Sequence, residues 1–235
     1  LLRLADAEWH EQGAGRATYE LALADLERAL AANPDRATER IARAWARIGL
    51  GRVLDALGAA TEAEREWQAA ATELGAMRSD DEPNAEIDGA LGWARVRLAE
   101  HRLADKLPPK AQVEAALQAF DRVLKVDAES ASAWHGRGVA RLVLATALFQ
   151  ARALEGVVED FDKALARDPK RLDVHLDKAR ALMLAFEVEK PIAARWDPAL
   201  AQFDLALKQP CSPWRVHAGR GLLFELRGQF PQAVQ

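Results

Sequence analysis

One stretch of sequence recurs along the chain, and this recurrence limits what the chain can fold into. In its clearest copy, Glu155–Pro169, the residues Val157, Phe161 and Ala164 fall at helical spacing on one face. The charged residues between them, Asp160 among them, fall on other faces. The large residue of the pattern recurs as Leu26, Trp67, Phe120, Phe161 and Phe203, with Ala or Val four positions before and three positions after each. The steps between these positions are 41, 53, 41 and 42 residues, which predicts an array of stacked repeats.

The repeats are expected to consist of helices alone. Sustained alternation of apolar and polar residues is absent, and Ala, Leu, Glu and Arg dominate, so we expect ten or eleven helices in antiparallel pairs and no strands. Gly58 is the expected stop of a long helix over Asp35–Leu57. Thr61 and Glu64 form a capping box for the next helix. Asp197 is the expected N-cap of a later helix that begins with proline in its first turn.

Composition and charge exclude some classes of function. The net charge of −4 and the pI near 5.8 give no electrostatic reason to expect nucleic acid or an anionic membrane as partner. The longest uncharged apolar stretch, Leu142–Ala151, is far shorter than the ~18 residues of a membrane span. The single cysteine, Cys211, fits a reducing compartment and predicts a cytoplasmic protein. One repeat domain over residues 1–235 is expected, as a fragment truncated at both ends, because the chain starts without methionine and stops inside a repeat.

A pattern of small and aromatic residues near the C-terminus has further copies along the chain. It places a small residue at Gly221, an aromatic at Phe224, a turn glycine at Gly228, and then Phe230 and Ala233. Two more copies comprise Leu50, Gly51, Leu54, Gly58, Ala63, Trp67 and Ala70, and Trp134, Gly138, Phe161, Ala164 and Pro169. The small residue recurs at Gly51, Gly92, Gly138, Ala179 and Gly221. This pattern resembles the tetratricopeptide repeat (TPR) over nearly the whole chain.

The resemblance implies an all-α, right-handed solenoid of antiparallel helix pairs. In it, small residues let paired helices approach closely, and the aromatic fills the space between one hairpin and the next. The usual TPR period is about 34 residues, whereas the period here is 41 or 42. An excess of seven residues is close to two helical turns, so unusually long helices are expected between Pro34 and Gly51 and around the turn between Gly138 and Phe161. A HEAT-type array, with a period of about 40–47, is the alternative that fits the spacing by number.

The resemblance also implies a binding surface, because the first helix of each TPR hairpin lines a concave groove that holds peptides or protein segments. The groove residues expected here are Arg52, Trp93, Arg97, His135 and Arg180. The lysine and asparagine clamp with which some relatives hold a C-terminal carboxylate is missing. Arginines beside apolar sites instead predict a partner segment with acidic and hydrophobic residues.

No residue pattern in the sequence indicates catalysis, a metal or a cofactor. His10-Glu11 begins like a zinc-protease motif but lacks the second histidine. His175 and His217 occupy the repeat position of Trp134, so packing roles are expected for both. We therefore predict a non-catalytic protein-interaction module or scaffold without cofactor. The alternative is a sensory or regulatory arm of a larger signalling enzyme, such as a bacterial kinase or protease, that binds an effector or its own catalytic domain.

Overall fold

The computed structural model describes residues 15–148, 154–189, 196–208, 216–217 and 220–221. Within these ranges the ordered elements are all α-helices, and no strand occurs. Chain contacts divide the molecule into two compact units, Leu1–Ala128 and Glu129–Gln235. Each unit is described by itself. That the whole chain acts as one repeat domain stays a prediction.

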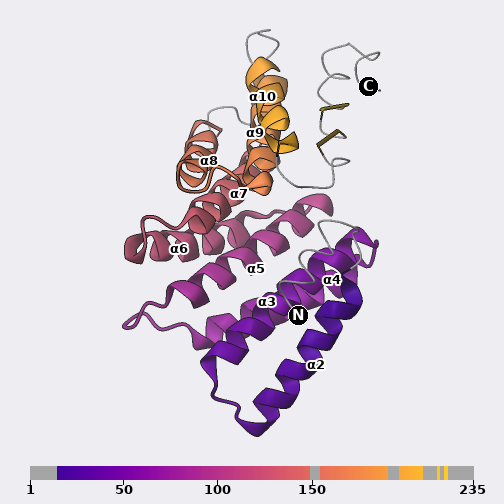
Figure 1. Ribbon diagram of the computed structural model, residues 1–235, viewed down its shortest axis with the longest axis vertical. Helices are drawn as coiled ribbons and strands as arrows, with labels where there is room; N and C mark the ends of the chain where they lie inside the picture. Colours follow the sequence, from indigo (N-terminus) through magenta and orange to yellow (C-terminus); the bar gives the residue numbers. More distant parts are fainter. Residues whose placement is uncertain (1–14, 149–153, 190–195, 209–215, 218–219, 222–235) are drawn as a thin grey trace. The chain divides into compact units, whose positions relative to one another are not determined.

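The described part of the first unit contains two complete helical hairpins preceded by one further helix. Its helices are α2 (Arg16–Ala32), α3 (Ala37–Ala56), α4 (Ala60–Met77), α5 (Ala85–Ala104) and α6 (Lys110–Val126). Helices α3 and α4 form one hairpin and α5 and α6 the next (Figure 1). Helix α2 packs on α3, α4 packs on α5, and the first helices of the two hairpins, α3 and α5, also contact each other.

The second unit repeats this arrangement. Helices α7 (Ala131–Leu148) and α8 (Glu155–Arg167) form one hairpin, and α9 (Leu172–Glu189) and α10 (Trp196–Leu207) form another. Helix α8 packs on α9, and the first helices α7 and α9 contact each other. Within each unit, therefore, the first helices of consecutive hairpins lie side by side and make one face of that unit.

Each hairpin closes by an aromatic ring of its second helix that lies on a small residue of its first. A Cβ atom added to Gly51 would lie 2.3 Å from the Trp67 ring, and one on Gly138 would lie 2.6 Å from the Phe161 ring. A Cβ atom added to Gly92 would lie 2.7 Å from the Phe120 ring. Side chains larger than hydrogen are thus excluded at these positions. The rings also lie within their own hairpin, and the Trp67 ring meets the His101 ring of the next hairpin edge-on, with centroids 5.9 Å apart, as the expected filling between hairpins requires.

Several expected helix ends differ from the structure. Helix α4 begins at Ala60 after Ala59, with no side-chain cap, so the predicted capping box of Thr61 and Glu64 is wrong. Asp197 lies inside the first turn of α10 and does not precede it. Both differences are of one or two residues, the usual uncertainty of a helix end. The expected long helix between Pro34 and Gly51 is present, because α3 has 20 residues, above the common 10–14. Around the turn between Gly138 and Phe161 the expectation holds for α7, with 18 residues, and is wrong for α8, with 13.

The α3–α4 and α5–α6 turns use the same left-handed backbone step with different residues. Gly58 has φ 80°, as its predicted role requires, and Ala59 N–H donates to the Leu54 carbonyl at 2.9 Å. Lys106 has φ 59°, and Leu107 N–H donates to the Arg102 carbonyl at 2.7 Å. Both are the Schellman arrangement that usually takes glycine at this step.

Replacing Lys106 with glycine is expected to raise the free energy of unfolding by about 1 kcal/mol. An L-residue in the left-handed region costs roughly 1–2 kcal/mol, part of which the greater freedom of glycine in the unfolded chain offsets. Urea denaturation measures the change. Gly58→Ala is the matched control and should shift stability in the opposite direction; equal signs for both variants would contradict the account of these turns.

Candidate functional site

In the first unit, the predicted groove residues come from α3 and α5. Trp93 is 8 % exposed, and its ring meets Phe120 edge-on with centroids 5.8 Å apart. The Arg97 guanidinium lies over the Trp93 ring at 5.4 Å and donates to Glu100 at 2.6 Å. Arg52 on α3 is half-buried. The ring and Glu100 together restrict the rotamers of the Arg97 side chain.

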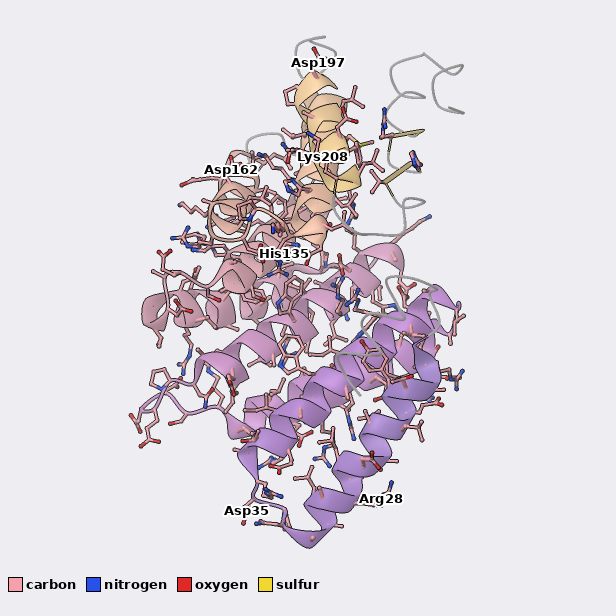
Figure 2. The ribbon with its side chains drawn as sticks, in the orientation of Figure 1. Arg28, Asp35, His135, Asp162, Asp197 and Lys208 are labelled. Atoms are coloured by element: carbon pink, nitrogen blue, oxygen red, sulfur yellow. The ribbon has the colours of Figure 1, made fainter. Side chains whose placement is uncertain are left out.

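In the second unit, His135 on α7, labelled in Figure 2, connects the two first helices through contacts with carboxylates of α9. Its imidazole is buried, with Nε2 2.9 Å from Asp177 Oδ2 and Nδ1 3.4 Å from Asp173 Oδ2, both on α9. Arg171 also approaches Nδ1, at 3.4 Å. Arg180, which is 63 % exposed, donates to the other oxygen of Asp177 at 3.2 Å. The polar cluster thus fixes α9 against α7 and leaves one guanidinium at the surface.

The carboxylates of this cluster are held in their charged form. Burial alone would raise the pKa of Asp177, but the hydrogen bond and charge of His135 and the charge of Arg180 outweigh it, and the pKa lies below its usual value. Burial likewise opposes ionisation of Asp173, whereas the charge of His135 and the hydrogen bond from Arg171 lower its pKa far below the usual value. Asp173 and Asp177 are therefore anions at neutral pH.

The five predicted groove residues divide by exposure. Arg52 and Arg97 are half-buried and Arg180 is exposed, whereas Trp93 and His135 are buried in packing contacts beneath the surface. The structure brings Arg97 onto Trp93, and it connects Arg180 to His135 through Asp177. Their role in binding stays a prediction.

A buried ionic cluster on α7 and α8 was not visible in the sequence. Asp160 is fully buried and accepts hydrogen bonds from Arg137 at 2.8 and 3.1 Å and from Arg141 at 2.8 Å. Trp134 lies beneath three cations, of which Arg137 and Lys163 are at 4.3 and 4.6 Å from its ring. The signal that could have found it is the pair of arginines four residues apart on the glycine-bearing face of α7.

The histidines and cysteine considered in the sequence have different outcomes. His175 is buried and hydrogen-bonds to Gln202 and to the Pro169 carbonyl, which confirms its packing role. His217 is exposed, so the packing role predicted for it is wrong. His10 and Cys211 lie outside the described residues.

Neither a metal-binding cluster nor a membrane-spanning helix occurs among the described residues. No group of three or more His, Cys, Asp or Glu side chains among them could hold a metal ion. Among the helices in these ranges, none combines the length and apolar character needed to cross a bilayer.

These features define a class of protein, the antiparallel helical-hairpin repeat in which an aromatic ring of the second helix packs near a glycine or alanine of the first. Solved structures specify the fold further as the tetratricopeptide repeat. A thermophilic TPR protein of Thermus thermophilus, TTC0263, matches at TM-score 0.55 and 21 % identity, over 99 % of this chain and 96 % of that one. PilF of Pseudomonas aeruginosa matches at TM-score 0.50 and 17 % identity, over 99 % and 85 %.

A third similar structure is a monomeric mutant of IFIT1 with a capped RNA, m7Gppp-AAAA. It matches at TM-score 0.58 and 16 % identity, over 97 % of this chain and 45 % of that one. No protein-family model matches the sequence, and no curated protein matches it. The structural matches confirm the predicted all-α, TPR-like fold and favour it over the HEAT alternative.

Proposed function

We propose that this chain is a non-catalytic protein-interaction module, or scaffold, that holds a peptide or protein segment on the first-helix face of its hairpins. The observation that carries the proposal is the Arg97 guanidinium lying over Trp93 on the α3–α5 face. Arginine is among the residues that carry most of the energy of protein interfaces, and the buried Trp93 ring beneath Arg97 restricts where its guanidinium can lie. The TPR fold supports this use of the face, and the cytoplasm is the location that we propose for it.

The partner segment combines acidic and apolar residues. Arg52 and Arg97 offer partly exposed guanidinium groups in the first unit, and Arg180, which pairs with Asp177, offers an exposed one in the second unit. Guanidinium groups bind carboxylates bidentately, with more geometric specificity than lysine provides. No nucleic acid and no membrane is included among the proposed partners, because the chain carries a net charge of −4.

Arg180→Gln is expected to weaken binding of an acidic peptide by about tenfold, the value of one charge-assisted hydrogen bond. The probe is a peptide selected on this chain from a phage-displayed library of random short peptides, and fluorescence anisotropy gives its Kd. Arg52→Gln should act in the same direction, and both losses should shrink at high salt. Arg28→Gln on α2, whose side chain is exposed and pairs with Asp25 on its own helix, is the matched control.

Selected peptides without acidic residues, or affinities that these arginine variants leave unchanged, would contradict the assigned surface. A regulatory arm of a larger signalling enzyme is the alternative that the sequence predicts. The full reading frame tests it, since a kinase or protease domain encoded next to this chain would favour that alternative.

A further inference from the structure

Helix α2 has an apolar face that is less covered than the same face of the other helices with this repeat pattern. Leu26 and Ala29 of α2 are only half-buried. The residues at the same repeat positions of α4, α6, α8 and α10 are at most 4 % exposed. They are Trp67, Phe120, Phe161 and Phe203 for Leu26, and Ala70, Val123, Ala164 and Ala206 for Ala29. Within the described part of the chain, this face of α2 therefore lacks the cover that the later repeats have.

In the later repeats this cover comes from the helix that directly precedes in the chain. In α4, α6 and α8, the ring at the position of Leu26 lies against a glycine of that preceding helix. Helix α2 packs on α3, which follows it in the chain, and there the Tyr19 ring lies against Gly49. Among the described helices none precedes α2. The partner that the half-open face needs is thus a first helix, supplied from the N-terminal side of Arg16.

Residues 1–12 have the sequence of such a first helix. Leu2, Ala5 and Trp9 recur at the spacing of one helical face, and charged residues lie between them. The Gly-Ala-Gly sequence at residues 13–15 follows and is typical of a turn. The stretch that directly precedes α2 therefore offers the apolar face and the turn that a hairpin with α2 requires.

We propose that residues 1–12 are the first helix of a hairpin with α2 and that Leu2 lies against Leu26. Twelve helical residues span about 18 Å, and Leu26 lies about 15 Å along α2 from Arg16, so the segment is long enough. An antiparallel pair that turns at Ala14 puts Leu2 opposite Leu26, since each is 12 residues away from Ala14. Leu26 is the non-aromatic member of its series, and its smaller side chain leaves room for a leucine where the later repeats have glycine or alanine. The row of first helices in the first unit then has one more member, before α3.

Amide hydrogen exchange of α2 in the full chain tests the proposal. Leu26→Asp is expected to speed exchange of the α2 amides by about tenfold or more, because it places a charge in the contact. Leu2→Asp should do the same from the other side, and the double variant should exchange no faster than the faster single variant. Leu21→Asp is the matched control, because Leu21 is 60 % exposed on the same helix, and it should change exchange by less than about twofold. The amides of α5 provide the internal reference.

Other occupants of this face give different results. If light scattering shows that the unmodified chain is a dimer and that Leu26→Asp is a monomer, a second copy covers α2 and the proposal is overturned. If Leu26→Asp speeds exchange and Leu2→Asp does not, Leu26 packs on α3 alone, which also overturns it. Additive effects of the two substitutions overturn the contact between them. A monomer in which both substitutions act on α2 without adding supports the hairpin.

Discussion

Replacing Phe161 by alanine is expected to lower the free energy of unfolding by about 3–5 kcal/mol. The ring is fully buried and lies on Gly138 within the α7–α8 hairpin, with the His135 ring also 5.9 Å from it. Its removal loses the transfer free energy of the ring and leaves a cavity that helices held by side-chain contacts close only in part. Urea denaturation followed by circular dichroism measures the loss. Leu148→Ala, at an exposed site, is the control and should change stability little.

A second substitution shows that the loss comes from the ring on the glycine. Gly138→Ala alone should destabilise by about 1–3 kcal/mol, because the new Cβ atom would lie 2.6 Å from the Phe161 ring and force it to move. In the Phe161→Ala background the same change should be neutral or stabilising, since the space is free and alanine favours the helix. Additive effects in the double variant would contradict the assigned contact.

The fold could be predicted because its determinants are local in sequence. In each hairpin, an aromatic residue of the second helix packs in the interior near a glycine or alanine of the first helix. Both residues can be recognised in the sequence by their type. Phe203 and Ala179 show this as well, since both lie in the core of the last hairpin of the second unit. The regular spacing of such pairs therefore predicts the order of the helices. A capping signal such as that of Thr61 can still place a helix end wrongly.

The candidate site could be predicted less well, because the exposure of a side chain depends on neighbours that the repeat pattern does not specify. Trp93 and His135 occupy groove positions of the repeat, yet both are buried, one against Phe120 and the other against the carboxylates of α9.

Asp160 shows that the burial of a charged side chain is equally hard to predict from the repeat pattern. The helical pattern assigns it to a polar face, whereas in the structure it is fully buried beneath Arg137 and Arg141. Both arginines come from α7 and occupy successive turns of one face. The carboxylate therefore neutralises two cations that would otherwise lie close together, and this contact is visible only once α8 is packed on α7.

Asp160→Ala is consequently expected to cost about 3 kcal/mol of unfolding free energy, the lower end of what the loss of one partner costs a buried ion pair. The lower end applies because Arg141 is 36 % exposed and water can reach it. Asp162→Ala is the matched control, two residues away on the same helix (Figure 2). Its carboxylate is 55 % exposed and pairs with Lys178, so about 0–1 kcal/mol is expected.

An apolar replacement of the whole cluster distinguishes charge from packing as the cause. Asp160→Leu combined with Arg137→Met and Arg141→Met removes every desolvated charge at once, and such replacements are often neutral or stabilising. We therefore expect the triple variant to be more stable than Asp160→Ala in urea denaturation. If the triple variant is as unstable as the single one, Asp160 contributes through shape. If Asp160→Ala costs no more than Asp162→Ala, the carboxylate is not needed to hold the two arginines.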